Sequence, residues 1–351
     1  MDEIIYTTPE EQIEKLKSQN LMIEDEDNAK KVLALYGYSN LIKSYREPYI
    51  IVVEGKKKYR SGVTFNQLVS LYILHKNLRN AVMAAMIDLE EYIKETVADV
   101  VAHSFGTHPD EYLKFKNYQN KRKKKLQFTL KGILEKMYKA LDTDKNPIYH
   151  YLTEHGIVPP WILFKSIYFS TIVNFIDQFK VPQKNEMVGK MYDVDKLEIE
   201  DEAARKLMMD TLAICMEYRN LAAHGGRTYN YVSDSNLRIK EIFSPEREVT
   251  ITGFSKLLFV LDLLEYRNPF MRLKDTLNEE VNRHCSEYPQ DVTYLGQIFN
   301  IDIVPTNTVY TTETSNKYHS NPHCSGIKKS VQMELEEAVE RGFKPCKRCY
   351  K

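Results

Sequence analysis

The chain has no excess of charge of either sign, because 49 Lys and Arg side chains balance 49 Asp and Glu side chains. This balance excludes a field over the whole molecule that would attract nucleic acid, so such contacts have to come from local patches. Long apolar runs are also missing: the most apolar stretch, residues 157–176, is interrupted by Pro159, Pro160 and Lys165. That interruption excludes a membrane-spanning helix there. The acidic N-terminus lacks the basic start and apolar run of a secretory signal, so we expect a cytoplasmic protein without membrane contact.

Cysteine is scarce and unevenly placed. The chain has five cysteines, and Cys324, Cys346 and Cys349 all fall near its end. An odd number with this clustering argues against a disulfide framework and favours a metal site. The other two, Cys215 and Cys285, lie on or just after predicted helices, and we interpret them as structural thiols.

Helical periodicity dominates most of the chain. Apolar residues recur three and four apart over 29–113, and the part from 64 to 101 contains no glycine or proline, which predicts a long helix. Further helices are expected from Pro160 through 162–179, from Asp201 to the Gly225-Gly226 pair, and near 255–282.

The pattern changes near residue 300, where short β-branched runs and turn residues replace the helical periodicity. At 351 residues the chain exceeds one typical domain. We therefore predict an all-α helical domain over 1–298, a linker over 299–307 and a small module over 308–351.

One predicted helix carries an arginine where an apolar residue is expected. At about 100° per residue, its apolar stripe of Ala204, Leu207, Met208, Leu212 and Cys215 leads on to Arg219. A guanidinium in this position needs an acid, a carbonyl, a subunit partner or a phosphate, because burying it unpaired costs several kcal/mol. Asn220 and His224 lie four residues apart on a neighbouring face.

These three residue types suit metal-independent cleavage of RNA. Histidine moves protons near neutral pH, arginine binds phosphate through its planar fork, and asparagine can orient either one. RNA supplies its own nucleophile, the 2′-OH, so proton transfer and charge stabilisation suffice and a 2′,3′-cyclic phosphate is left. By spacing alone, the same cluster is also explained as a capping or ion-pair network at a helix end.

Several sequence blocks, in this order and at this spacing, resemble the Abi-like abortive-infection proteins of the HEPN ribonuclease superfamily. They are Tyr36-Gly37-Tyr38 with Leu41-Ile42-Lys43-Ser44-Tyr45, Gly62-Val63-Thr64-Phe65 leading to Leu78-Arg79, Pro159-Pro160-Trp161, and Arg219-Asn220-Leu221-Ala222-Ala223-His224 through Asn230. Arginine followed by histidine at this distance is similar to the superfamily signature. The resemblance covers about residues 30 to 231.

The resemblance implies an all-α HEPN-type helical bundle, a homodimer that joins two helix ends into one RNA-cleaving cleft, and a role in phage defence or growth arrest. It implies that Arg219 stabilises the transition state, His224 is the general acid and base, and Asn220 orients them. Arg227 and Asn230 become supporting residues. The chain has Gly225 where the family often has a second histidine, and Arg227-Thr228-Tyr229-Asn230 where it often has Arg-Leu-Trp-Asn.

The most basic stretch of the chain lies between residues 110 and 140. It includes the run Lys121, Arg122, Lys123, Lys124 and Lys125, with aromatic residues interleaved around it. Clustered cations bind the phosphate backbone and aromatic rings can stack on bases. Contact with RNA and a solvated surface loop are both consistent with this pattern.

The last 33 residues contain a candidate zinc site. His319, Cys324 and the pair Cys346 and Cys349 supply one imidazole and three thiolates, which complete a tetrahedral structural zinc shell. His323 competes with His319 as the fourth ligand, but it adjoins Cys324 and, in an extended strand, would point to the other side.

The segment 309–350 also resembles a small zinc-binding module appended to many bacterial proteins. We expect its helix near 331–341 to pack on a hairpin made from residues 308–312 and Tyr318. The zinc is expected to stabilise the module and to take no part in catalysis.

Three functions remain open on the sequence. The first is an endoribonuclease toxin that acts on RNA and is held silent by an antitoxin protein or a small RNA. The second is a non-catalytic RNA-binding or sensor protein on the same fold. The third, a structural adaptor, requires Arg219 to be paired with an internal acid.

Overall fold

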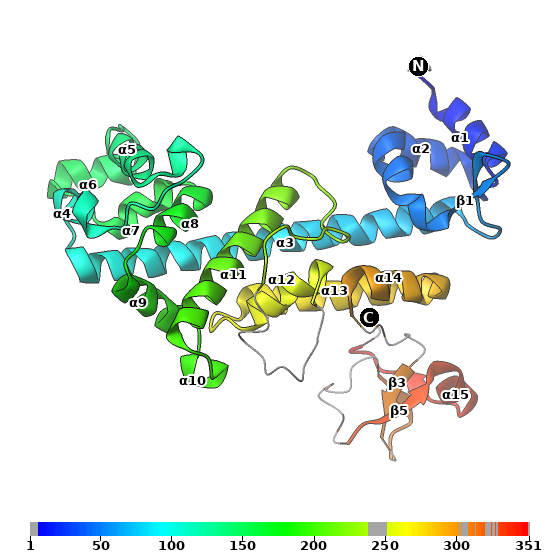
Figure 1. Cartoon of the computed structure of the whole chain (residues 1–351). Helices are drawn as coiled ribbons and strands as arrows, with labels where there is room; N and C mark the ends of the chain where they lie inside the picture. The colour runs from blue at the N-terminus through cyan, green and yellow to red at the C-terminus, as the bar shows by residue number, and fades with distance from the viewer. Residues whose placement is uncertain are drawn as a thin grey trace. The chain divides into compact units, whose positions relative to one another are not determined.

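The chain is mostly helical in its computed structural model (Figure 1). The structure describes residues 6–237, 251–301, 303, 308–312, 314–319, 324, 327 and 329–349. It divides into two compact units. Unit 1 is formed by Met1–Asn77 and Leu277–Lys351, and unit 2 by Leu78–Thr276.

Unit 2 contains the predicted motif and is built from helices. The long helix α3 (Phe65–Phe105) begins in unit 1, and the first part of α13 (Asn268–Glu287) closes unit 2. Between them lie α4 (Pro109–Tyr112), α5 (Leu130–Leu141), α6 (Ile148–His155), α7 (Pro160–Leu163), α8 (Phe169–Asp177), α9 (Val181–Met191), α10 (Val194–Leu197), α11 (Asp201–Ala223) and α12 (Gly253–Asp262). Short 3-10 turns connect them: η3 (Phe115–Asn117), η4 (Leu126–Phe128) and η5 (Phe164–Ser166).

The two helices that frame the motif form where the sequence predicts them. Helix α3 starts after Thr64, whose hydroxyl accepts a hydrogen bond from the backbone N–H of Gln67 at 3.1 Å, as an N-cap residue does. Helix α11 starts at Asp201, and its predicted apolar stripe is fully buried, with each residue at most 1% exposed. Burial of this stripe fixes the rotation of α11 and hence the direction in which Arg219, Asn220 and His224 point.

Unit 1 combines the two ends of the chain. Its helical elements are α1 (Pro9–Ser18), α2 (Glu26–Tyr36), a π-helical turn η1 (Ser39–Lys43), η2 (Glu47–Tyr49), η7 (Pro289–Asp291) and α14 (Val292–Phe299). It also contains an antiparallel pair, β1 (Ile50–Val53) and β2 (Lys56–Tyr59), in which Ile50 faces Tyr59. The periodicity over 29–113 predicts helices throughout this region and does not reveal the hairpin, because four residues per strand are too few for a clear period.

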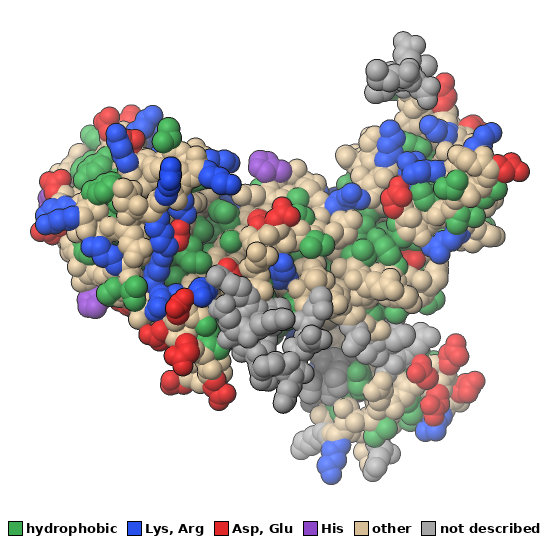
Figure 2. All heavy atoms as spheres, in the orientation of Figure 1, with side chains coloured by type: hydrophobic (Ala, Val, Ile, Leu, Met, Phe, Trp, Pro, Cys, Tyr) green, Lys and Arg blue, Asp and Glu red, His purple; other side chains and the backbone are tan. Residues whose placement is uncertain are grey.

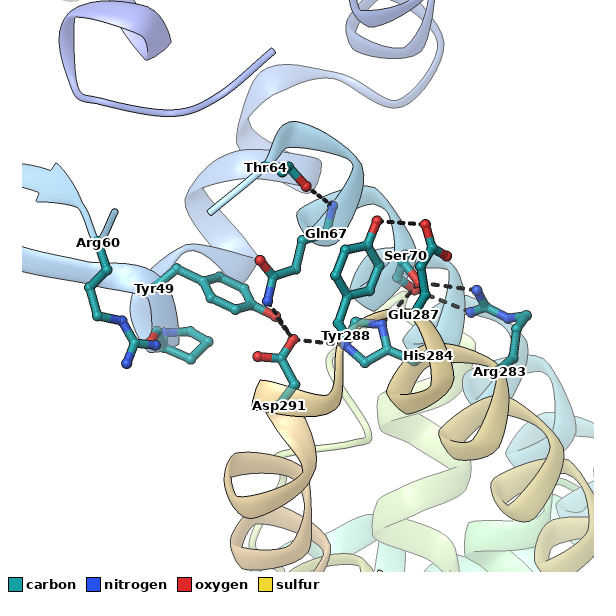
Figure 3. A network of polar contacts seen from close by, with 11 residues as sticks. Tyr49, Arg60, Thr64, Gln67, Ser70, Arg283, His284, Glu287, Tyr288 and Asp291 are labelled. Atoms are coloured by element: carbon teal, nitrogen blue, oxygen red, sulfur yellow. Dashed lines mark hydrogen bonds and ion pairs between the residues drawn. The ribbon is translucent and has the colours of Figure 1, made fainter. Parts of the chain in front are cut away.

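A buried polar network ties the two chain segments of unit 1 together (Figure 3). Its centre is Asp291, whose Oδ2 accepts hydrogen bonds from Tyr49 Oη at 2.7 Å and Gln67 Nε2 at 2.9 Å. The same oxygen lies 2.9 Å from His284 Nε2, and His284 Nδ1 lies 2.9 Å from Ser70 Oγ. His284 is completely buried. The network therefore couples α3 to the end of α13 and to η7.

The C-terminal module contains short strands and one short helix. These are β3 (Thr308–Thr311), β4 (Lys317–Tyr318), β5 (Val331–Glu334), α15 (Leu335–Glu340) and β6 (Lys344–Pro345). Strand β3 pairs antiparallel with β5, β4 pairs parallel with β6, and Tyr310 forms an antiparallel bridge with His319.

Two predicted elements differ from the structure. The helix expected near 255–282 is two helices, α12 and α13, which are separated by residues 263–267. Pro269 lies at the start of α13. Proline has no N–H to donate and favours a helix start. The helix expected near 331–341 is shorter, because residues 331–334 form β5 and pair with β3. Among the described residues, no helix is both long and apolar enough to cross a membrane.

Candidate functional site

The predicted motif occupies the C-terminal end of α11. Helix α11 ends at Ala223 and His224 is its C-cap. Gly225 then adopts φ +72°, a left-handed conformation that favours glycine. The N–H of Gly226 bonds to the Leu221 carbonyl at 2.8 Å, and that of Gly225 to the Ala222 carbonyl at 3.2 Å. These two bonds form a Schellman motif, so the chain turns away immediately after His224.

Arg219 forms an ion pair with an acid of its own chain. Its Nε lies 3.6 Å from Oε2 of Glu90 on α3. The other oxygen of Glu90, Oε1, lies 2.8 Å from Lys94 Nζ, and the Glu90 side chain is only 15% exposed. The Arg219 side chain is 31% exposed. None of its three guanidinium nitrogens makes a hydrogen bond to the part of the chain that the structure describes, and Nε is buried without one, so Glu90 compensates the charge of Arg219 and the planar end of the guanidinium is left for a ligand.

The helix end is attached to α3 at a second point. Arg79 Nη1 donates a hydrogen bond to the Gly225 carbonyl oxygen at 3.2 Å. Arg79 and Glu90 are eleven residues apart, or about 16 Å along a helix. Helix α3 therefore contacts the motif on both sides, at Arg219 and at the turn after His224. Figure 1 shows α11 crossing α3 in this region.

Asn220 and His224 are both exposed. Neither side chain makes a hydrogen bond or an ion pair with any residue that the structure describes. Their positions one helical turn apart place them side by side. The imidazole and the amide are thus accessible to a ligand from solvent.

The two predicted supporting residues differ in their surroundings. Arg227 is exposed, whereas Asn230 is half-buried and follows the buried Thr228 and Tyr229. The chain that follows is fixed to α11 by Glu217, which accepts hydrogen bonds from residues 231–235. The donors are Tyr231 Oη at 3.0 Å, Ser233 Oγ at 2.6 Å, the Asp234 N–H at 3.1 Å and Ser235 Oγ at 2.5 Å. Burial would raise the pKa of Glu217, but the bonds from Ser233 and Ser235 outweigh it and the pKa is lowered.

The predicted basic run is divided between paired and unpaired cations. Lys121 Nζ lies 2.9 Å from Asp177 Oδ1, and Lys123 forms an ion pair with the other carboxylate oxygen. Arg122, Lys124 and Lys125 are exposed. The structure does not bring the run into contact with the motif.

A group in the C-terminal module can hold a metal ion. The ligand atoms of His319, Cys324, Cys346 and Cys349 all lie within 4.8 Å of one another. Cys349 Sγ is 3.7 Å from His319 Nδ1. The N–H of Cys349 bonds to the Cys346 carbonyl at 3.1 Å, which makes the Cys-x2-Cys pair a tight turn. His323, the competing ligand, lies outside the described residues.

The protonation states in this group suit metal binding. Burial, together with the charge of Lys317, lowers the pKa of His319 and favours the neutral imidazole that metals bind. The backbone N–H of Arg348 lowers the pKa of the Cys346 thiol. By contrast, burial raises the pKa of the Cys215 thiol, which is completely buried. Cys285 is buried as well, and both thiols pack in cores as predicted.

Sequence reasoning missed the residues on other helices that complete these sites. In the sequence Arg79 is only the end of one matching block, and no pattern singles out Glu90 or Asp177. Glu90 and Lys94 are four apart on a predicted helix, which indicates a local ion pair. No pattern in the sequence indicates that Glu90 also contacts Arg219.

One comparison with known proteins finds a match. The model of a family described as Abi-like protein matches residues 31–230. Searches of curated proteins and of solved structures find no match.

Proposed function

The chain belongs to the Abi-like protein family, and from this premise we propose that it is a metal-independent endoribonuclease of the HEPN type that acts in bacterial abortive infection. One observation carries the proposal. An arginine, an asparagine and a histidine sit on the last turn and a half of α11, where Asn220 and His224 are exposed and the terminal nitrogens of Arg219 are unoccupied.

The chemistry requires only these groups and the RNA. Neutral His224 accepts the proton of a ribose 2′-OH, the 2′-oxygen forms a bond to phosphorus, and the bond from phosphorus to the 5′-oxygen breaks. Arg219 binds the phosphoryl oxygens, whose negative charge grows in the pentacoordinate transition state. Asn220, beside His224, orients the imidazole. The products are a 2′,3′-cyclic phosphate and a 5′-hydroxyl, and the departing 5′-oxygen takes its proton from the protonated imidazole of His224 in a second protomer.

We propose a homodimer as the active form. Arg219 and His224 point to different faces of α11, about 140° apart at five residues, so one helix end does not surround a phosphate. Two copies of the helix end related by a twofold axis supply a base from one protomer and an acid from the other. RNA is the substrate. In the cytoplasm, an antitoxin protein or a small RNA keeps the enzyme inactive.

The direct test is the chemistry of the RNA ends. Purified full-length protein is incubated with RNA in EDTA, and the products are examined for 2′,3′-cyclic phosphates. Arg219→Ala and His224→Ala are each expected to lower cleavage by about a thousandfold, the scale of losing a transition-state contact or a catalytic proton carrier. Cleavage that survives both substitutions would refute the assignment.

The contact between Arg219 and Glu90 also favours a second function. A structural adaptor requires Arg219 to be paired with an internal acid, and Glu90 lies 3.6 Å away. One experiment separates the functions, since an adaptor does not bind RNA through Arg219, whereas a binding or sensor protein binds RNA and yields no cyclic phosphate ends.

We propose zinc as the metal of the C-terminal module. Three thiolates and one imidazole form a closed tetrahedral set that is typical of structural zinc. His319, Cys324, Cys346 and Cys349 would hold it, and the ion would supply folding energy to a piece with few buried side chains.

A further inference from the structure

The segment Lys114–Phe128 contains only one sign of charge. Its fifteen residues include no Asp or Glu and seven cations, namely Lys114, Lys116, Lys121, Arg122, Lys123, Lys124 and Lys125. Apart from the turns η3 and η4 it is irregular. It is fixed to the end of α8, because the N–H of Gln119 bonds to the Gln178 carbonyl at 2.6 Å and that of Lys121 to Gln178 Oε1 at 2.9 Å.

A single carboxylate organises the cations of this segment. Asp177, the last residue of α8, pairs with Lys121 and Lys123 from the segment and, at 3.6 Å, with Lys184 from α9. Lys184 Nζ also donates to the Asp177 backbone carbonyl at 2.8 Å, and its side chain is only 9% exposed. One negative charge among three lysines leaves the cluster with a net charge between +1 and +2 near neutral pH, because burial and the neighbouring Lys121 lower the pKa of Lys184 to about 8.

Further cations surround this cluster and have no acid of their own. Arg122, Lys124 and Lys125 are exposed, and none of their side chains makes an ion pair or a hydrogen bond with residues that the structure describes. Figure 2 shows Lys and Arg side chains gathered in a column across the part of unit 2 that contains α7, α8 and α9. An uncompensated array of this kind attracts a polyanion.

The composition of the array indicates the kind of polyanion. Lysines predominate, and lysine binds phosphate as a point charge with little demand on geometry. Apolar side chains stand among the cations: Phe115 is 47% exposed and Leu126 is 84% exposed. Lys180 Nζ donates to the Lys116 carbonyl at 2.7 Å, which brings another lysine beside Phe115. Cations along a backbone track with an aromatic ring between them are typical of surfaces that bind single-stranded nucleic acid.

The array lies well away from the motif. Next to Lys184 on α9, Asn185 accepts a hydrogen bond from Arg205 Nη1 near the start of α11 at 2.6 Å. Arg219 is fourteen residues further along α11, or about 21 Å at 1.5 Å per residue. At about 3.4 Å per nucleotide along one strand, a dinucleotide does not span this separation, whereas a single strand of about ten nucleotides does.

We propose that the segment Lys114–Phe128, held in place by Asp177 and the buried Lys184, is a binding surface for the sugar-phosphate backbone of single-stranded RNA, separate from the cleavage motif. The inference rests on the proposed function in one respect, because it takes the strand held on this surface to be the strand cut at α11. The surface reads no sequence, since its contacts are to phosphate, and it sets how long an RNA has to be for tight binding.

The binding test uses a charge-removing variant that spares the paired residues. Arg122→Gln, Lys124→Gln and Lys125→Gln are combined in full-length protein that also carries His224→Ala, so that RNA stays intact. The matched control combines Lys56→Gln, Lys57→Gln and Lys58→Gln on β2. Fluorescence anisotropy with a labelled RNA of about 20 nucleotides is expected to show about tenfold weaker binding for the first variant and a salt slope smaller by about 2, at 0.7 per lost phosphate contact.

Equal affinities and salt slopes for the two variants would overturn the inference, and the array would then serve another polyanion such as an acidic protein. Cleavage distinguishes this failure from failure of the proposed function. With His224 restored, the surface variant is expected to cut a dinucleotide at the wild-type rate and to show a higher KM only for the long RNA. If the wild type cuts neither RNA and the surface variant still binds RNA more weakly, the ribonuclease function is refuted and the binding surface is supported.

Discussion

Glu90 lies beside Nε of Arg219, at an ion-pair distance of 3.6 Å without a hydrogen bond, rather than at the planar end of the guanidinium. The same carboxylate is shared with Lys94 at 2.8 Å, and Lys94 Nζ also donates to the Lys165 carbonyl at 3.4 Å. The acid is therefore fixed by α3 and by the chain after α7, and its charge attracts the Nε side of Arg219, which directs the terminal nitrogens away from Glu90. In this arrangement Glu90 is a positioning residue.

Replacing Glu90 is expected to lower kcat while leaving KM nearly unchanged. Glu90→Gln keeps the shape but removes the charge that orients Arg219, so a loss of about tenfold is expected, less than for Arg219→Ala. Glu202→Gln is the control, because Glu202 forms a pair with Lys206 at 2.9 Å on the exposed surface of α11. If Glu90→Gln cleaves like the wild type, the ion pair has no part in catalysis.

Arg79 is expected to matter for cleavage more than for stability. Its hydrogen bond to the Gly225 carbonyl fixes the turn that follows His224, and removing it costs about 1 kcal/mol at a half-exposed position. Arg79→Gln should therefore unfold in urea close to the wild type and cleave about tenfold more slowly. Asn80→Ala is the neighbouring control, since Asn80 is exposed. A variant that loses stability and activity in proportion would contradict this separation.

The pairs around Asp177 predict a stability that falls in acid. Burial would raise the pKa of Asp177, but hydrogen bonds from Lys123 and Lys121 outweigh it and lower the pKa to about 2. The unfolded carboxyl has a pKa of about 3.9. A folded pKa below the unfolded one contributes stability that is complete above about pH 5 and is lost as the pH falls through 2.

Asp177→Asn is expected to be less stable than the wild type by about 1–2 kcal/mol at pH 7. The difference should shrink as unfolding is measured at successively lower pH. Asp234→Asn, an exposed acid in the same unit, provides the comparison. A difference that stays constant from pH 7 to pH 2.5 would show that the carboxyl is not held by the lysines.

Metal content tests the C-terminal module. Full-length protein purified without chelator is expected to contain about one zinc ion per chain, and Cys346→Ser combined with Cys349→Ser should contain none. Cys285→Ala removes a cysteine outside the group and should keep the metal. Loss of the ion should increase proteolysis of the residues after 307 and leave RNA cleavage unchanged. Wild-type protein without bound metal would end the assignment.

The polar network of unit 1 predicts that loss of the Tyr49 hydroxyl lowers the free energy of unfolding by a measurable amount. Tyr49 is 1% exposed, and its hydroxyl donates to Asp291. Tyr49→Phe should lower the free energy of unfolding by about 1–3 kcal/mol, because the carboxylate loses a partner in a buried place. Tyr168→Phe changes a ring that is 80% exposed and should have no effect. Equal urea transitions for the two variants would show that the bond contributes nothing.

The sequence predicts the long helices well, because their periodicity is local. Apolar residues three and four apart predict a helix over 64–101, and α3 starts there but runs four residues further, to Phe105. The end of α11 follows from Gly225 and Gly226. The metal ligands follow from spacing, since Cys346 and Cys349 are adjacent in one turn. The position of Arg219 in line with the apolar stripe of α11 also predicts that the guanidinium needs a partner.

The partner itself was beyond sequence reasoning. Glu90 resembles many other acids on amphipathic helices, and only the crossing of α3 and α11 brings it to Arg219. The strand β5 was missed for the same reason, because its pairing with β3 is made between distant residues and overrides local preference. Whether the motif cleaves RNA, and whether two copies meet, stay predictions.

The discontinuity of unit 1 limits how the protein can be dissected. A fragment trimmed to the matched residues 31–230 would keep the motif and its two contacts with α3, made by Arg79 and Glu90. It would leave Tyr49, Gln67 and Ser70 without Asp291 and His284, and it would remove Gly253, whose carbonyl accepts from Tyr218 Oη at 3.0 Å. Inactivity of such a fragment would report broken folding rather than a missing catalytic group. Point substitutions in the entire polypeptide are the route by which loss of activity can be ascribed to the motif.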